Sequence, residues 1–161
     1  MEIGIRMNNH REEERWDALK AFMEEEIPFN KHLGIRVTSL RRGHVILEVS
    51  PKSSFIGDPI RPALHGGLVA TLADTAGGLA AFSVVEVHKA VCTIDMRVDY
   101  IRPSSVNQMM YAESEVLRLG QHIVFTQTRV YQDSPELLVA ISSATYRVSS
   151  SPSHVIDTES T

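Results

Sequence analysis

Asp74 is the residue of this chain most able to do chemistry, because it is the only charged side chain in an apolar run from about Gly66 to Val85. A helix that is apolar all round is normally buried, and a buried carboxylate without a cationic partner is costly. No Lys or Arg lies within the run; the nearest are Arg61 and Lys89. Asp74 is therefore either a general base or nucleophile, or a structural acid that pairs with a basic residue of a strand or of another subunit or that caps a backbone group.

The faces of this predicted helix differ in side-chain size. At about 100° per residue, the residues that share a face with Asp74 are all small: Gly67, Ala70, Thr71, Gly77, Gly78 and Ala81. The opposite face holds Leu68, Val69, Leu72, Ala76 and Leu79. The bulky face suits packing on a sheet, and the small face predicts that another group approaches the helix backbone closely. That group is a substrate in a functional interpretation and a second helix in a structural one.

The tripeptide His65-Gly66-Gly67 stands at the start of the same helix. The first N–H groups of a helix have no internal partners, and the helix dipole is positive there. Glycine also permits close approach to the backbone. These N–H groups could hold an anion or a developing oxyanion. A Gly-rich turn, with His65 as a hydrogen-bonded structural histidine, is the alternative.

Other common catalytic arrangements do not occur in the sequence. No Gly-x-Ser-x-Gly segment supplies a serine nucleophile. The seven histidines show no metal-binding spacing and there is no cysteine cluster, so we expect no metal. Cys92 falls on the apolar side of its predicted strand, where a buried and inert thiol is expected.

Two strands are predicted before the central helix and four after it. They cover Ile35–Leu40, His44–Ser50, Val91–Ile101, Met109–Leu117, His122–Tyr131 and Glu136–Val148, and the loop Pro51–Pro62 leads into the helix. Short connections favour antiparallel pairing. We therefore expect an α+β fold in which an antiparallel sheet wraps around a long central helix.

The strand Val91–Ile101 has the clearest alternation. One side carries Thr93, Asp95, Arg97 and Asp99, and the other carries Cys92, Ile94, Met96, Val98 and Tyr100. A strict period of two predicts a polar face that includes Thr93 and an apolar face that includes Cys92.

The chain is predicted to contain one domain, over residues 11–148. Apolar residues at helical spacing predict an amphipathic helix from Arg11 to about Pro28, and Asn30–Leu33 reads as a link. Residues 1–10 carry no periodic pattern and are expected to be a flexible start. Residues 149–161 are polar and Ser-rich, which predicts a disordered tail.

Composition argues against several classes of function. The net charge of the 161 residues is −4, and residues 1–26 carry all of it. The neutral remainder offers no basic field to nucleic acid or to an anionic membrane. Residues 62–85 are long enough to span a membrane, but the charge of Asp74 favours a helix buried in a soluble protein. The single cysteine forms no internal disulfide, which favours the cytoplasm.

Three segments together resemble a known family. They are Leu64-His65-Gly66-Gly67, the helix segment Ala-Thr-Leu-Ala-Asp at residues 70–74, and the strand segment Thr-Ile-Asp-Met-Arg-Val-Asp-Tyr-Ile-Arg-Pro at residues 93–103. This combination resembles the hotdog-fold acyl-CoA thioesterases of the phenylacetate-pathway (PaaI-like) group, over about residues 17–148. The resemblance implies a hotdog fold and hydrolysis of an aromatic or medium-chain acyl-CoA to a free acid and coenzyme A.

The resemblance also implies roles for single residues. Asp74 matches the catalytic acid, as general base or nucleophile. The Gly66 N–H, in the motif begun by His65, matches the oxyanion donor, with Gly67 beside it. Thr93 matches a hydroxyl that helps to place the attacking water. Family sites form between two subunits, so Thr93 would serve Asp74 of the other chain of a homodimer or a dimer of dimers (a homotetramer).

Coenzyme A would enter as part of the substrate, and no other cofactor is implied. Its phosphates need cations, for which Arg102, Arg61 and Lys89 are the candidates by motif proximity. Asp58 stands where several relatives carry an Asn or Gln that orients the thioester, so it either takes that role or caps its loop. Two other functions stay open: a hotdog hydratase or dehydratase, and a non-catalytic acyl-CoA-binding protein.

Overall fold

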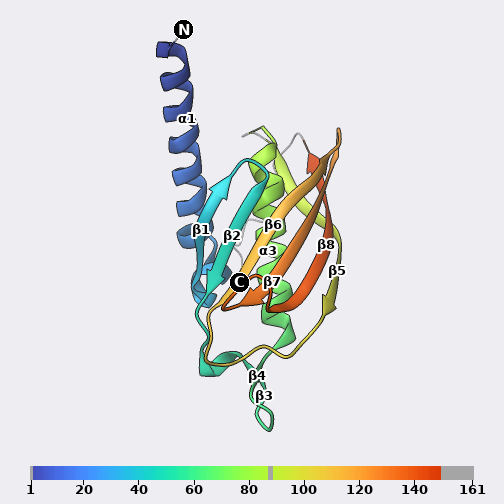
Figure 1. The fold of residues 1–161 in the computed structure, drawn as a ribbon. Helices are drawn as coiled ribbons and strands as arrows, with labels where there is room; N and C mark the ends of the chain where they lie inside the picture. The colour runs from blue at the N-terminus through green and yellow to red at the C-terminus, as the bar shows by residue number, and fades with distance from the viewer. Residues whose placement is uncertain (1, 87–88, 150–161) are drawn as a thin grey trace, which may run out of the picture.

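The computed structural model of the chain describes residues 2–86 and 89–149. One curved sheet wraps around the helix α3, and a helical N-terminal segment lies beside β1 (Figure 1). The helical elements are α1 (Glu2–Ala21), the π-helix η1 (Phe22–Glu26), α2 (Pro28–Leu33), the 3₁₀ turn η2 (Ser53–Phe55) and α3 (Gly66–Val84). The strands are β1 (Ile35–Arg41), β2 (His44–Val49), β3 (Ile56–Asp58), β4 (Ala63–Leu64), β5 (Ala90–Tyr100), β6 (Met110–Leu119), β7 (Ile123–Gln132) and β8 (Leu138–Ser149).

The sheet has the order β1-β2-β6-β7-β8-β5 with antiparallel neighbours throughout, and β3 and β4 form a separate hairpin. The predicted α+β architecture is confirmed, and it is the hotdog arrangement. Each of the six predicted strands lies within two residues of its observed bounds, and α3 ends one residue earlier than expected. The predicted loop Pro51–Pro62 contains η2 and β3.

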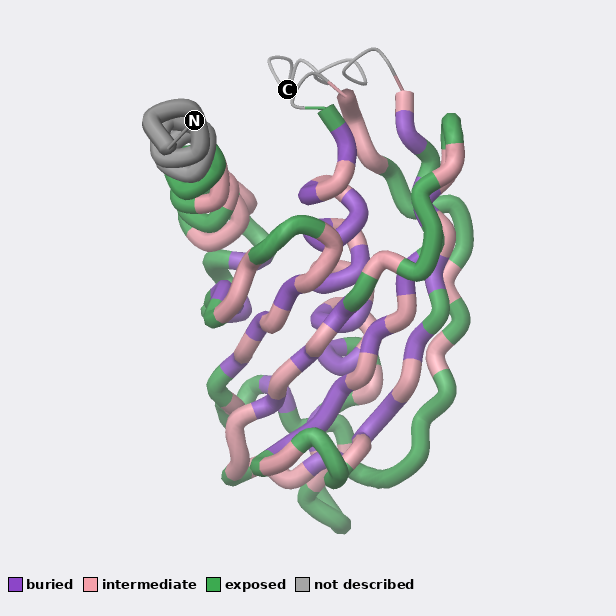
Figure 2. Tube along the Cα trace, turned by 45° about the horizontal axis from the view of Figure 1, so that its top comes forward, coloured by how far each residue is buried: buried purple, intermediate pink, exposed green. Residues whose placement is uncertain are grey.

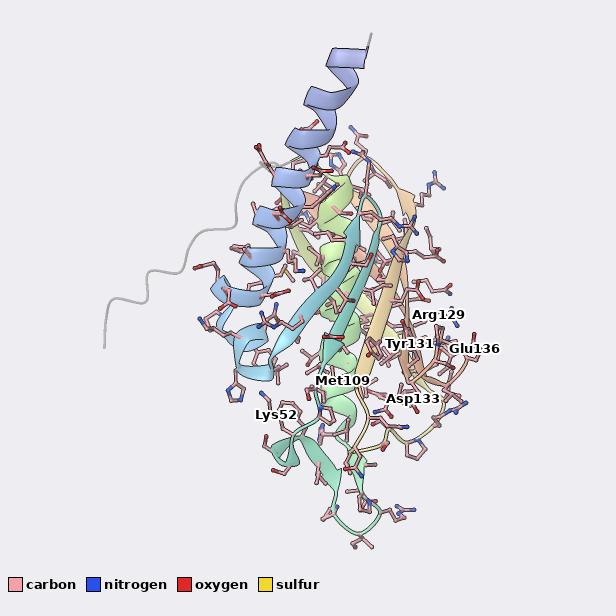
Figure 3. All side chains as sticks on the ribbon, turned by 60° about the vertical axis from the view of Figure 1, so that its left-hand side comes forward. Lys52, Met109, Arg129, Tyr131, Asp133 and Glu136 are labelled. Carbon is pink, nitrogen blue, oxygen red and sulfur yellow. The ribbon has the colours of Figure 1, made fainter. Side chains whose placement is uncertain are left out.

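The core lies between α3 and the concave face of the sheet, where buried residues line both (Figure 2). The bulky helix face is buried there as predicted, with Leu72 at 0% and Leu79 at 1% exposure. Within the described residues, α3 alone is long and apolar enough to cross a membrane, and 61% of its most apolar stretch is buried inside the fold. The apolar surface of α3 is therefore covered largely by the sheet. Arg129 of β7 lies on the side of the sheet away from α3, and Glu136 lies in the turn between β7 and β8 (Figure 3).

The N-terminal segment, defined here as α1, η1 and α2, differs from its prediction in two places. The expected helix is present, but its α-helical part ends at Ala21 and continues as a π-helix. The predicted link Asn30–Leu33 is wrong, because these residues belong to α2. Pro28 stands in the first turn of α2, where its missing N–H costs nothing, and Gly34 ends it in the left-handed conformation (φ 75°).

The described residues cover only part of the predicted N-terminal start (residues 1–10) and of the predicted tail (residues 149–161). The backbone of residues 2–10 is part of α1, and residue 149 is the last of β8. The rest of the predicted tail, residues 150–161, lies outside the described residues.

A β-bulge in β5 changes which residues face α3. Thr93 pairs with Tyr146 of β8, but the next partner of β8, Thr145, pairs with Asp95, so Ile94 is an extra residue. The bulge reverses the alternation, and Thr93 faces α3 together with Met96 and Val98. The predicted placement of Thr93 on the polar face is therefore wrong, whereas Asp95, Arg97 and Asp99 are exposed as predicted. The predicted burial of Cys92 and Ile94 is wrong as well, since both are exposed.

Candidate functional site

Two hydroxyl groups hold the carboxylate of Asp74. Thr93 Oγ1 donates to Asp74 Oδ1 over 2.9 Å, within the same chain. Tyr146 Oη lies 3.3 Å from the same Oδ1 and 3.1 Å from the backbone oxygen of Asp74. The expectation that Thr93 would serve Asp74 of another chain is therefore wrong, because the bulge in β5 turns Thr93 toward its own α3.

The small face of α3 accommodates Tyr146. A Cβ atom at Gly77 would overlap the Tyr146 hydroxyl, and one at Gly78 would lie 3.5 Å from the ring carbon Cε1. The group that approaches the helix closely at Gly77 is thus this side chain rather than a substrate or a second helix. Burial, and next the charge of Asp74, raise the pKa of the Tyr146 hydroxyl, which keeps it protonated as a donor.

Tyr146 was missed by the sequence reasoning. It lies in the predicted strand Glu136–Val148, on the face of β8 that also carries Ala140, Ser142 and Ala144, and it is 1% exposed. One large side chain among small inward residues was the signal that could have found it. Gly77 and Gly78 of the helix lie opposite Tyr146, and because they have no side chains they leave the space that its ring fills.

Asp74 forms no ion pair with any described Lys, Arg or His. The structural alternative, a salt bridge to a basic residue of a strand, is therefore not realised among the described residues. Both hydroxyl donors reach Oδ1, and no described donor reaches Oδ2. A carboxylate held by one oxygen keeps the other available to a proton or to an electrophile.

Asp74 lies at one end of a cavity of about 350 Å³ between α3 and the N-terminal segment. Thr93 and Tyr146 line the cavity beside it. Most of the remaining wall is apolar and comes from the N-terminal segment, α3 and β5: Leu19, Phe22, Met23, Ile27, Leu79, Phe82 and Val91. The volume lies at the lower end of the ~300–1,000 Å³ typical of small-molecule sites.

The start of α3 is capped by its own histidine. His65 Nδ1 accepts a hydrogen bond of 2.8 Å from the Gly67 N–H, so His65 is the N-cap and the Gly67 N–H is occupied. The Gly66 N–H donates to no acceptor among the described residues. Of the two glycine N–H groups that the sequence offered, Gly66 is the one free to bind an oxyanion.

A single chain does not bring Gly66 and Asp74 together. The two residues are eight positions apart on one helix, which separates them by about 12 Å at 1.5 Å per residue. An oxyanion donor lies about 3 Å from the oxyanion, an attacking water about 3–3.5 Å from the carbon, and a general base about 3 Å from that water, so the donor and the base must fall within roughly 10 Å of each other. Within one chain, Thr93 lies beside Asp74, whereas His65, Gly66 and Gly67 lie away from both at the N-terminus of α3.

The candidate cations differ in how they are engaged. Arg102 lines a second cavity of about 330 Å³ together with Gly66 and Tyr100, and its side chain has no ion pair among the described residues. Tyr100 Oη donates to the Gly66 backbone oxygen over 2.9 Å. Arg61 pairs with Asp58 at 3.2 Å, and Lys89 with Glu86 at 3.8 Å.

Asp58 caps its loop. Its Oδ1 accepts from the backbone N–H groups of Ile60 and Arg61 at 2.9 and 3.1 Å. These bonds lower the pKa of the Asp58 carboxyl, that from Arg61 most. Of the two roles left open for Asp58, the structure supports the loop cap.

Comparisons with known proteins identify relatives of this chain. The family model described as Thioesterase superfamily matches residues 62–139. The medium/long-chain acyl-CoA thioesterase YigI of Salmonella typhimurium is 29% identical over 135 residues, which cover 76% of this chain and 86% of YigI. A putative esterase of Halobacterium salinarum is 32% identical over 124 residues, which cover 72% of this chain and 81% of the esterase.

Solved structures agree on the fold. A Shewanella oneidensis protein related to the thioesterase superfamily superposes with a TM-score of 0.76 at 25% identity, covering 86% of this chain and 97% of that one. A mutant of the phenylacetic acid degradation protein PaaI from Thermus thermophilus has a TM-score of 0.67 at 24% identity, covering 74% and 97%. The second likeness is one of fold alone.

Proposed function

This chain belongs to the thioesterase superfamily, and we propose that it hydrolyses acyl-CoA thioesters with Asp74 as the general base or nucleophile. The observation that carries the proposal is a carboxylate fixed through Oδ1 by Thr93 and Tyr146, with Oδ2 unengaged, at the end of an apolar cavity. The printed function of YigI supports acyl-CoA as the substrate class. The place in the PaaI-like group rests on the resemblance of residues 64–67, 70–74 and 93–103, and the T. thermophilus PaaI shares the fold.

The proposed reaction uses few groups because a thioester carbonyl is already electrophilic. Asp74 Oδ2 accepts a proton from water while the water oxygen bonds to the carbonyl carbon. The tetrahedral oxyanion accepts a hydrogen bond from a Gly66 N–H. The carbon–sulfur bond then breaks, and the coenzyme A thiolate takes the proton from Asp74. Direct attack by Oδ2 on the carbon is the alternative first step.

We propose that the Gly66 N–H of each site comes from a second copy of the chain. The separation of about 12 Å along α3 prevents one chain from supplying both Asp74 and Gly66 to one carbonyl. β5 is an edge strand of the sheet with Ile94 and Tyr100 more than half exposed, which suits it for pairing with another copy. A dimer through this edge, or a dimer of such dimers, is the expected assembly.

The coenzyme A phosphates are proposed to meet Arg102. It shares a cavity with Gly66, whereas Arg61 and Lys89 are each engaged by an acidic neighbour. His65 acts as a positioning residue, because its side chain caps the helix that presents the Gly66 N–H. A cytoplasmic location is part of the proposal, since Cys92 is an exposed free thiol.

The test is release of free thiol from purified protein with a panel of acyl-CoAs, aromatic and aliphatic. The proposal expects turnover by the wild type and a loss of about 10²-fold or more in Asp74→Asn, as base catalysis contributes about 10²–10⁴-fold. The amide keeps an oxygen that both hydroxyls can reach, so the variant should remain folded. A wild type that releases no thiol from any acyl-CoA would overturn the proposal.

A further inference from the structure

We infer that the cavity between α3 and the N-terminal segment holds the acyl tail of the thioester, and that Gly78 and Phe22 set the length of tail it accepts. The inference rests on the proposed function, because it takes Asp74 as the place of the thioester carbon. It assigns an occupant to this cavity, and it gives a role to the N-terminal segment, which takes no part in the proposed chemistry.

The cavity is polar at one end and apolar over most of the rest of its wall. Asp74, Thr93 and Tyr146 stand together at one end through their hydrogen bonds. Away from them the wall is largely aliphatic and aromatic. Asn30, a polar residue of the N-terminal part of the wall, is 4% exposed and donates through Nδ2 to the Met23 backbone oxygen. A molecule with one polar end and a hydrocarbon remainder fits this distribution.

One face of α3 provides a path from the carboxylate into the apolar part. Asp74, Gly78 and Phe82 are spaced four residues apart and all line the cavity. They extend over about 12 Å of the helix at 1.5 Å per residue. Gly78 has no side chain to obstruct this path directly after Asp74. A tail that begins at Asp74 therefore passes Gly78 before it meets the ring of Phe82.

The opposite wall is fixed in place rather than loosely laid against the sheet. Arg15 of α1 donates to the backbone oxygen of Val85, just past the end of α3, over 2.8 Å. Glu24 of η1 accepts from the backbone N–H of Val37 at 2.8 Å and pairs with Arg36 at 2.6 Å. The segment is thus tied both to α3 and to the first strand of the sheet.

Further contacts hold the base of the same wall. Lys52, labelled in Figure 3, donates to the backbone oxygen of His32 of α2 over 3.0 Å.

The π-helix η1 contributes Phe22 and Met23 to the cavity, and π-helical turns are rare and often occur at functional sites. Phe22 is 51% exposed although it lines the cavity, which puts it at the boundary with solvent. Its ring is therefore placed to close over a tail of limited length.

The experiment compares kcat/KM for acetyl-, hexanoyl-, decanoyl- and palmitoyl-CoA in the full chain. Gly78→Leu fills the path, and a Cβ at this position would lie an ordinary 3.5 Å from Tyr146 Cε1, so a side chain can begin there without a clash. We expect the decanoyl-to-acetyl ratio to fall by about tenfold or more, as buried methylenes discriminate by about 10–200-fold. Phe22→Ala opens the boundary and should move the preference toward palmitoyl-CoA.

The matched control is Phe125→Ala. Phe125 is also a half-exposed phenylalanine, at 41%, but it lies in β7 and lines no cavity with Asp74. It should keep the wild-type order of substrates. An unchanged order in both Gly78→Leu and Phe22→Ala, in a wild type that hydrolyses acyl-CoA, would overturn the inference while the proposed function stands.

A binding measurement distinguishes failure of the proposed acyl-tail site from failure of the proposed hydrolysis. S-decyl-CoA, a thioether that cannot be hydrolysed, is titrated into the wild type and Gly78→Leu by calorimetry. Binding by the wild type that Gly78→Leu loses supports the tail site even if no acyl-CoA is hydrolysed. Equal binding by both, or none by the wild type, contradicts it.

Discussion

Thr93 Oγ1 donates a 2.9 Å hydrogen bond to Oδ1 of Asp74 in the same chain, across the gap between β5 and α3. The bond exists because Ile94 is an extra residue in β5 and turns Thr93 toward the helix. Together with Tyr146 it occupies one oxygen of the carboxylate and fixes its plane. The orientation of the candidate catalytic group is thus set by its own chain, whereas its oxyanion donor must come from elsewhere.

Thr93→Val should lower kcat while KM changes little, because the isosteric methyl group leaves Asp74 with one donor fewer. A hydrogen bond to a charged group is worth about 1.5–3 kcal/mol, which corresponds to roughly tenfold or more in rate. Thr93→Ser keeps the hydroxyl and should recover most of the loss. Steady-state thiol release on the three proteins measures this, and equal rates for Val and Ser would show that the hydroxyl has no positioning role.

The neighbouring glycines of α3 should respond in opposite directions to the same change. A methyl group at Gly77 overlaps the Tyr146 hydroxyl, so Gly77→Ala should destabilise by about 1–3 kcal/mol as overpacking does. Gly78→Ala makes an ordinary contact and removes a flexible helical glycine, so it should be neutral or stabilise by up to about 1 kcal/mol. Thermal melting of the pair decides the matter, and similar melting temperatures would contradict the packing of Tyr146 on this face.

Stability should fall as the pH rises above about 10, the ordinary pKa of tyrosine. Burial and the charge of Asp74 raise the pKa of Tyr146 in the folded state. Between its unfolded and folded pKa values the folded state binds more protons, so the free energy of unfolding decreases with rising pH. Denaturant unfolding of the wild type and Tyr146→Phe from pH 8 to 11, about a unit or two either side of that value, measures this slope.

The Phe variant should lose the part of the alkaline slope that Tyr146 contributes. Tyr131, whose pKa is raised by burial, keeps its own contribution in both proteins and serves as the internal reference. An identical pH dependence in the two proteins would mean that Tyr146 is not the protonated donor that the geometry requires.

The sequence predicted the fold closely because the fold depends on patterns that a linear sequence carries. The apolar run of α3 and the alternation of the strands specify a helix buried by a sheet, and the observed bounds differ by at most two residues. α2 was missed because six residues are too few for a periodic pattern, although Pro28 and Gly34 marked its two ends.

The site was predicted less completely because it depends on register. A strict period of two placed Thr93 opposite to the face it occupies, since a one-residue bulge reverses the alternation beyond it. Cys92 was misplaced by the same cause. The small face of α3 was correctly identified, but its principal occupant at Gly77, Tyr146, comes from a strand 69 positions along the chain and no local pattern connects the two.

Gly66→Pro should remove the oxyanion donor without breaking α3. Gly66 is the first helical residue, where proline is favoured, and His65 has the extended conformation (φ −62°, ψ 132°) that a residue before proline adopts. Gly66→Ala is the matched control, because it adds the same Cβ against Tyr100 and keeps the N–H. Proline should cost about 10²–10³-fold in kcat, and alanine far less. Equal losses in the two variants would assign the effect to crowding.

The central claim is that each site combines Asp74 and Thr93 of one chain with Gly66 of another, and mixing two inactive variants tests it most directly. Asp74→Asn and Gly66→Pro are unfolded together in equal amounts and refolded, beside each variant and the wild type treated alone. Random association should rebuild about a quarter of the sites, so the mixture should recover about a quarter of the thiol release of the refolded wild type. A mixture as inactive as its components, beside a wild type that regains its rate, would contradict the shared site.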